Sequence, residues 1–212
     1  MWSLYGYGDG MIFRITQKAS SKLRVMCSAA TGTRPVMQEW YCNLMTVQRR
    51  QLFLFTHAVS LFSFWVPAAG SSLDNFGEMF RRHAMDTLRD YRFSEADASQ
   101  VLDKGPDVFA KVTDRGVVGS MVDFAKMLRY VVHDEGGLDR LRQRALNDIA
   151  NDCPMSKIDM EHPAERLRRI LMDKRPYDIA VHRAGARPPS DQPPDIRGTR
   201  ERSRWAHDRE PS

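Results

Sequence analysis

Cysteine is scarce in this sequence. Its three cysteines, Cys27, Cys42 and Cys153, lie far apart, and no C-x-x-C pair is present. This spacing supports neither a disulfide framework nor a zinc knuckle. We therefore expect a reducing, cytoplasmic setting and neither a metal nor another cofactor.

Long apolar runs are also rare. Residues 52–70, LFLFTHAVSLFSFWVPAAG, approach membrane-spanning length, and Arg49 and Arg50 precede them like a cytoplasmic flank. Polar side chains such as Thr56 and His57 interrupt the run, and its Phe, Val and Trp residues favour two buried strands joined by a turn. The N-terminus has no charged stretch followed by an apolar run, so no secretory signal is expected. We expect no contact with a membrane.

The central part of the sequence lacks an excess of either charge. Residues 40–173 carry 18 Lys/Arg and 19 Asp/Glu, whereas residues 1–39 carry 5 against 2 and residues 174–212 carry 9 against 6. The net charge of +5 therefore comes from the two ends of the chain. It gives no argument that the folded body binds nucleic acid.

The pattern of apolar residues predicts a single α+β domain over residues 11–172, with a mixed, largely antiparallel sheet of about five strands packed with four to five helices. The predicted strands are short apolar segments at residues 11–16, 40–47, 51–56, 59–66 and 107–113. Residues 17–39 are polar and small, and a loop is predicted at 31–35. The predicted helices cover residues 72–91, 94–102, 120–135, 138–150 and 163–172.

The two ends of the chain are predicted to lie outside this domain. Residues 1–10 are interpreted as an N-terminal extension, and Met11 is an alternative start. Residues 173–212 hold six of the eleven prolines together with many arginines, which predicts a disordered Arg/Pro-rich tail. Its arginines and one Trp favour weak contact with nucleic acid, whereas its interspersed Asp and Glu favour a solubilising role.

One candidate site lies in the segment TDRGVVGSMVDF, residues 113–124. It is interpreted as a tight turn from a strand into a helix. In the structural interpretation, Ser120 and Asp123 form a capping box that starts the helix. In the functional interpretation, Arg115, Gly119 and Ser120 bind an anion at the helix start.

Sharper chemical motifs are missing around this turn. GVVGS is neither a Walker loop nor G-x-G-x-x-G, and it fits an RNA-binding KH loop poorly. A nucleophilic serine is the least supported hypothesis, because His133 would lie about 20 Å along the same helix. The segment HDEGG, residues 133–137, cannot direct consecutive helical side chains at one metal ion.

The chain resembles an uncharacterised bacterial domain-of-unknown-function family, family 6933, over about residues 11–171. The shared landmarks are the strand-helix start IFRITQKASSKL, the meander WYCNLMTVQRRQLFLFTHAVSLFSF, and the segments AKVTDRGVVGSMVDF, HDEGG and CPMS. The family pattern at the turn is similar to DRSVLGSMND, from which this sequence departs at Gly116, Val118 and Val122. The resemblance implies the fold and a bacterial cytoplasmic setting, and it adds no catalytic residue.

These features leave two classes of function open. The first is a non-enzymatic binding or interaction domain, for which a protein partner is expected. The alternative is an enzyme or effector that acts on a phosphorylated or nucleic-acid substrate through the anion site at residues 115–120. Whether the protein is an enzyme is left undecided by the sequence.

Overall fold

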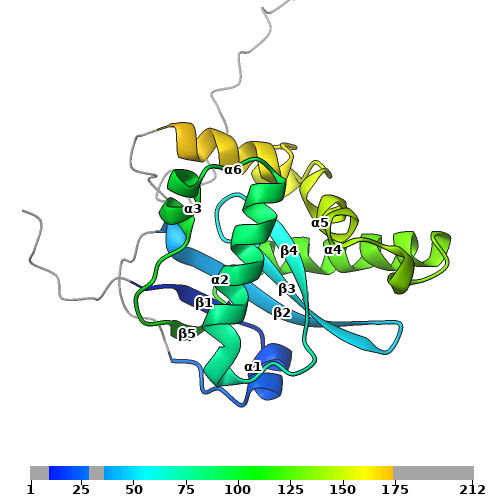
Figure 1. Cartoon of the computed structure of the whole chain (residues 1–212), viewed down its shortest axis with the longest axis horizontal. Coiled ribbons are helices and arrows are strands. Elements are labelled where there is room, and N and C mark those ends of the chain that lie inside the picture. Colours follow the sequence, from blue (N-terminus) through cyan, green and yellow to red (C-terminus); the bar gives the residue numbers. More distant parts are fainter. Residues whose placement is uncertain (1–9, 29–35, 174–212) are drawn as a thin grey trace, which may run out of the picture. The chain divides into compact units, whose positions relative to one another are not determined.

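The computed structural model describes residues 10–28 and 36–173 (Figure 1). The predicted extension at residues 1–10 and the predicted tail at 173–212 therefore lie, apart from one residue each, outside the described residues. The predicted loop at 31–35 does so as well.

A five-stranded mixed sheet forms the centre of the described structure, with the strand order β4-β3-β2-β1-β5. Its strands are β1 (Ile12–Ile15), β2 (Glu39–Val47), β3 (Arg50–His57), β4 (Ser63–Pro67) and β5 (Val108–Lys111). β1 pairs in parallel with β2 and β5, whereas β2, β3 and β4 form an antiparallel meander. The predicted α+β class and mixed sheet are confirmed.

Six α-helices and three short 3-10 helices occur in the described residues. The α-helices are α1 (Gln17–Leu23), α2 (Leu73–Asp90), α3 (Glu95–Val101), α4 (Arg115–Asp134), α5 (Gln143–Asn151) and α6 (Pro163–Met172). The 3-10 helices are η1 (Val36–Gln38), η2 (Leu138–Arg140) and η3 (Ser156–Ile158). Pro163 occupies the first turn of α6, where its missing N–H costs no hydrogen bond.

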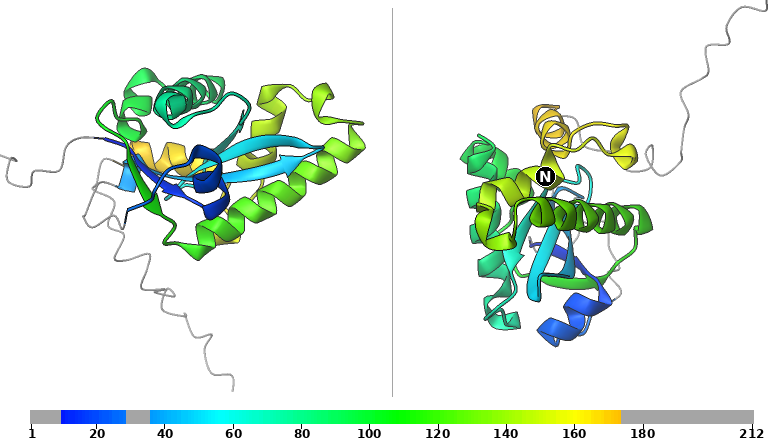
Figure 2. Two further views of the ribbon diagram at one scale, coloured as in Figure 1. Left: turned by 90° about the horizontal axis from the view of Figure 1, so that it is seen from below. Right: turned by 90° about the vertical axis from the view of Figure 1, so that its right-hand side faces the viewer.

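The helices form one layer on each face of the sheet (Figure 2). Alternate side chains of the strands point to opposite faces, so each face has its own apolar core. Phe13, Phe53 and Phe55 face α2, which contributes Phe76 and Phe80. The opposite core is built by α4 and α5 against the other face of the meander and includes Tyr41, Leu54, Trp65, Val117 and Phe124.

α1 lies within residues 17–39, where the apolar pattern predicted no helix because only Ala19 and Leu23 of it are buried, although the family resemblance indicated a strand-helix start there. Two other predicted elements have wrong bounds. β4 begins at Ser63 instead of residue 59, since Leu61 adopts a left-handed conformation with φ 60°. The predicted helix over 138–150 is divided into η2 and α5.

The apolar run at residues 52–70 forms most of β3 and all of β4. Its side chains from Leu52 to Val66 are nearly all buried, on both faces of the sheet, which explains why the run is almost continuously apolar. Within the described ranges, no helix combines the length and the apolar character needed to cross a bilayer.

Candidate functional site

The segment predicted as a tight turn is the first part of a helix. α4 begins at Arg115, and Asp114 is its N-cap. The Oδ1 atom of Asp114 accepts hydrogen bonds from the N–H groups of Gly116 at 2.7 Å and Val117 at 3.3 Å. The predicted capping box of Ser120 and Asp123 is therefore wrong, because both residues lie inside the helix that they were expected to start.

The three residues predicted to bind an anion do not converge. Arg115 is exposed at the start of α4, and Gly119 faces open space. Ser120 is 5% exposed and donates its hydroxyl proton to the carbonyl oxygen of Gly116 at 3.1 Å. Asp123 forms a surface ion pair with Lys126. Anion binding at this helix start stays a prediction. The Asp114 carboxylate makes it less favourable, because it already accepts hydrogen bonds from the N–H groups of Gly116 and Val117.

Asp114 also connects α4 to the segment that follows α5. Lys157 Nζ lies 2.9 Å from Asp114 Oδ2. Burial raises the pKa of the Asp114 carboxyl, but the hydrogen bond and charge of Lys157 and the N–H groups of Gly116 and Val117 outweigh it. The pKa therefore lies below its usual value, and the carboxylate is charged at neutral pH.

Replacing Asp114 with alanine is expected to lower the free energy of unfolding by about 1–2 kcal/mol, because the start of α4 loses its cap. Asp114→Asn keeps an acceptor oxygen and should lose about half as much. Ser120→Ala loses only a hydrogen bond within the helix and should cost less than either. Urea denaturation followed by circular dichroism measures all three, and a larger loss for Ser120→Ala than for Asp114→Ala would contradict the assignment.

A buried Ser-His pair lies at the end of β3. His57 Nδ1 is 2.8 Å from Ser60 Oγ, and His57 Nε2 is 3.2 Å from the carbonyl oxygen of Met37. That carbonyl can only accept, so Nε2 carries the proton and the Ser60 hydroxyl donates to Nδ1. Both side chains are 0% exposed, so the pair is enclosed in the core instead of facing a substrate.

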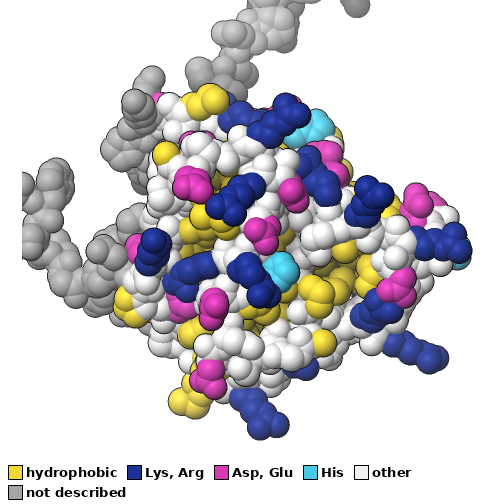
Figure 3. Space-filling view, in the orientation of Figure 1, with side chains coloured by type: hydrophobic (Ala, Val, Ile, Leu, Met, Phe, Trp, Pro, Cys, Tyr) yellow, Lys and Arg dark blue, Asp and Glu magenta, His cyan; other side chains and the backbone are white. Residues whose placement is uncertain are grey.

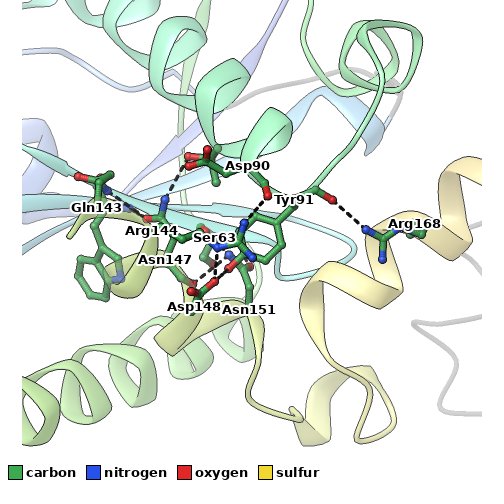
Figure 4. A network of polar contacts seen from close by, with 11 residues as sticks. Ser63, Asp90, Tyr91, Gln143, Arg144, Asn147, Asp148, Asn151 and Arg168 are labelled. Atoms are coloured by element: carbon green, nitrogen blue, oxygen red, sulfur yellow. Dashed lines mark hydrogen bonds and ion pairs between the residues drawn. The ribbon is translucent and has the colours of Figure 1, made fainter. Parts of the chain in front are cut away.

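The outer edge of β4 is hydrogen-bonded by side chains of α5 (Figure 4). Asn151 accepts from the N–H of Ser63 at 2.8 Å and donates to its carbonyl oxygen at 2.7 Å. Asn147 accepts from the N–H of Trp65 at 3.1 Å, and Gln143 donates to the Trp65 carbonyl at 2.7 Å. We call Gln143, Asn147 and Asn151 the amide ladder.

The spacing of the amide ladder matches that of the strand. Four helical residues rise about 6 Å, and two strand residues advance about 6.6 Å. Outward-facing backbone groups recur at every second strand residue, so amides at every fourth helix position meet them in turn. The ladder replaces a sixth strand and covers an edge that would otherwise be open to pairing with another chain.

A second polar cluster in Figure 4 joins α2, α5 and α6. The Tyr91 hydroxyl donates to Asp148, which also accepts from Arg144 Nε at 2.6 Å. The Arg144 guanidinium lies 3.7 Å from the centre of the Tyr91 ring, and Arg168 donates to the Tyr91 carbonyl. Burial raises the pKa of the Tyr91 phenol, and its hydrogen bond to Asp148 adds to this. Tyr91 therefore stays protonated and acts as a structural donor.

An open cavity lies between the β2–β3 hairpin and the segment from η2 into α5. Its volume is about 770 Å³, and we call it the hairpin cavity. Apolar residues from β3, β4, α5 and the segment that holds η2 form part of its lining, namely Leu52, Trp65, Leu138, Leu141 and Leu146. Figure 3 shows apolar side chains exposed in a hollow to the right of α2, with charged side chains along its right-hand rim.

The charged lining of the hairpin cavity is mainly basic. Lys22, Arg49 and Arg50 line it together with one acidic residue, Asp139. Asp139 forms an ion pair with Arg50. Trp65 also lines the cavity, and its buried indole N–H has no acceptor among the described residues.

Sequence reasoning missed both the amide ladder and the hairpin cavity. The ladder had a usable signal, because its amides recur at every fourth residue of α5 beside the apolar Leu146 and Ala150. The cavity had none, since its lining comes from segments far apart in the chain. No group of three or more His, Cys, Asp or Glu side chains within the described ranges is arranged to hold a metal ion.

The comparisons with known proteins identify a family and no activity. The model of a family described as "Domain of unknown function (DUF6933)" matches residues 12–166. No curated protein and no solved structure matches the chain.

Proposed function

We propose that this chain, which belongs to the DUF6933 family, is a non-enzymatic binding domain whose ligand site is the hairpin cavity. The observation that carries this proposal is a cavity of about 770 Å³ whose lining is half apolar and half polar, with three basic side chains and one acidic one. Cavities that bind small molecules commonly have volumes of about 300–1,000 Å³ and combine apolar walls with a few polar groups.

The charges of the cavity favour a small apolar ligand with a negative group. Lys22 and Arg49 add positive charge to the rim beyond the Arg50–Asp139 pair. The Trp65 indole is fully buried, so its N–H belongs to the core behind the cavity and not to the surface that a ligand meets.

The backbone of the hairpin turn gives independent support. Gln48 and Arg49 both have positive φ angles, 47° and 66°, as the two central residues of a type I′ turn require. Asn-Gly is preferred in such a turn, because larger side chains are strained there. Gln48 uses its position to accept a hydrogen bond from the Leu138 N–H at 2.8 Å. Arg49 occupies a strained position on the rim, and strain of this kind is concentrated at functional sites.

The chemistry of the lining favours binding over catalysis. Among the described residues, the hairpin cavity is lined by no serine, cysteine or histidine. The buried Ser60–His57 pair belongs to the core at the end of β3. The lining therefore supplies a basic and apolar surface without the nucleophile-base pair that acyl transfer uses.

Replacing Arg49 with glycine is expected to weaken binding and to stabilise the fold at the same time. We expect about fivefold lower affinity for the fluorescent probe anilinonaphthalene sulfonate, because one charge of the rim is lost. Glycine relieves the left-handed strain, so the free energy of unfolding should rise by about 0.5–1 kcal/mol. Fluorescence titration and urea denaturation measure the two effects on the same protein.

Arg115→Gln is the matched control, since it removes an exposed arginine at the start of α4. Its affinity for the probe should equal that of the wild type. If Arg115→Gln weakens binding and Arg49→Gly does not, the ligand site lies at the helix start that the sequence suggested, and the proposal is wrong.

A further inference from the structure

We propose that the ligand of the hairpin cavity carries a carboxylate and that Asp139 is an internal competitor for the place of this group on Arg50. This inference rests on the proposed function of the cavity. It adds the chemical class of the ligand and a residue that controls the ligand's entry.

The ion pair shows that Arg50 is arranged for an anion with two oxygens. Arg50 Nη1 donates to Asp139 Oδ1, and Arg50 Nη2 donates to Asp139 Oδ2 at 2.7 Å. Two parallel N–H···O bonds of this kind match the geometry of a carboxylate. Asp139 thus places on the cavity rim the group that a carboxylate ligand would bring.

The pair is exposed enough for a ligand to replace Asp139. The Arg50 and Asp139 side chains are 56% and 74% exposed. Exposed ion pairs contribute little to stability, because water screens the charges and both side chains lose freedom. A ligand that adds apolar contact with Leu52, Trp65 or Leu146 gains burial that Asp139 does not have.

Asp139 lies in a short segment between two helices. We call residues 136–140 the strap, which contains η2 and lies between α4 and α5. The strap begins with Gly136 and Gly137, whose φ angles of 76° and 141° are readily adopted only by glycine. The Gln48 side chain ties the strap to the hairpin turn through the Leu138 N–H. The buried Leu138 side chain and the Gln48 contact also hold the strap, so Asp139 can leave Arg50 while α4 and α5 stay in place.

Asp139→Asn tests the competition directly. Decanoate and decanol, which share an apolar body and differ in charge, are each titrated against bound anilinonaphthalene sulfonate. The variant should bind decanoate about fivefold more tightly than the wild type does, whereas its affinity for decanol should not change. Asp123→Asn is the matched control, since it removes an equal charge from another exposed ion pair, and it should change neither affinity.

The same substitution in an Arg50→Gln background completes the test. Without Arg50, Asp139→Asn should no longer affect decanoate, because the site of competition is gone. If Asp139→Asn leaves decanoate affinity unchanged, or raises both affinities equally, competition is excluded while the cavity remains a ligand site. If neither compound displaces the probe from any variant, the ligand class and the proposed cavity are both wrong.

Discussion

Replacing Asn151 with alanine is expected to lower the free energy of unfolding by about 2–4 kcal/mol, because two buried backbone groups of Ser63 lose their partner. Asn151 is 0% exposed, and its amide both accepts from and donates to Ser63. Water cannot replace these contacts without entering the space between α5 and β4. The loss should therefore include the cost of unsatisfied polar groups in addition to that of two hydrogen bonds.

Gln143→Ala is the matched control for this prediction. Gln143 also donates to a backbone carbonyl of β4, but it lies at the exposed end of the amide ladder. Water can take its place, so the expected loss is under about 1 kcal/mol. Guanidinium denaturation followed by circular dichroism compares the two variants. Equal losses would show that α5 is held by its apolar side alone.

Acid is expected to destabilise the protein through His57. Burial lowers the pKa of His57 to about 4 from its ordinary value of 6.5, although the backbone contact with Met37 raises it slightly. In the unfolded chain His57 takes up a proton as the pH falls through 6.5, whereas in the folded chain it resists protonation down to about 4. The contribution is complete above pH 6.5 and is lost on acidification, by about 3 kcal/mol at pH 4.

The measurement compares the wild type with His57→Gln in urea at several pH values between 4 and 7. The variant should be less stable at pH 7, because it loses a fitted core side chain. Its stability should nevertheless fall less steeply on acidification, since the other titrating groups are common to both proteins. Parallel pH profiles for the two proteins would mean that His57 is not held neutral by the fold.

The sheet could be predicted because its strands carry local signals. The segments at β2 and β3 are apolar and aromatic and flank the polar turn at Gln48 and Arg49. The helix predicted at residues 94–102 also has a local signal, since a capping box of Ser94 and Asp97 starts α3. α1 is short and buries only Ala19 and Leu23, so its apolar pattern gave no signal, and only the family resemblance indicated a helix there.

The start of α4 was misjudged because two glycines suggested a turn. Both lie inside the helix, where each costs about 1 kcal/mol relative to alanine. Gly116 has a packing reason, since a Cβ atom there would lie 3.0 Å from Lys157 Nζ. Burial of Val117, Met121 and Phe124 offsets the cost of the two glycines. Asp114 was the better N-cap, because the apolar spacing begins directly after it at Val117.

The candidate site depends on long-range contacts that no local pattern contains. Arg50 and Asp139 are 89 positions apart in the sequence and form an ion pair in the fold. Trp65 lines the same cavity only because the meander brings β4 beside β3. The net charge did not indicate a basic site, because residues 40–173 are nearly neutral as a whole. The basic rim of the hairpin cavity is visible only when the sheet brings these segments together.

The hairpin cavity is tested most directly by a crystal structure of the protein soaked with decanoate. The carboxylate is expected on the Arg50 guanidinium in place of Asp139, with the alkyl chain against Leu52, Trp65 and Leu146. An empty cavity with Asp139 still paired to Arg50 would contradict the proposed site. Decanoate bound at Arg115 instead would place the ligand site at the start of α4.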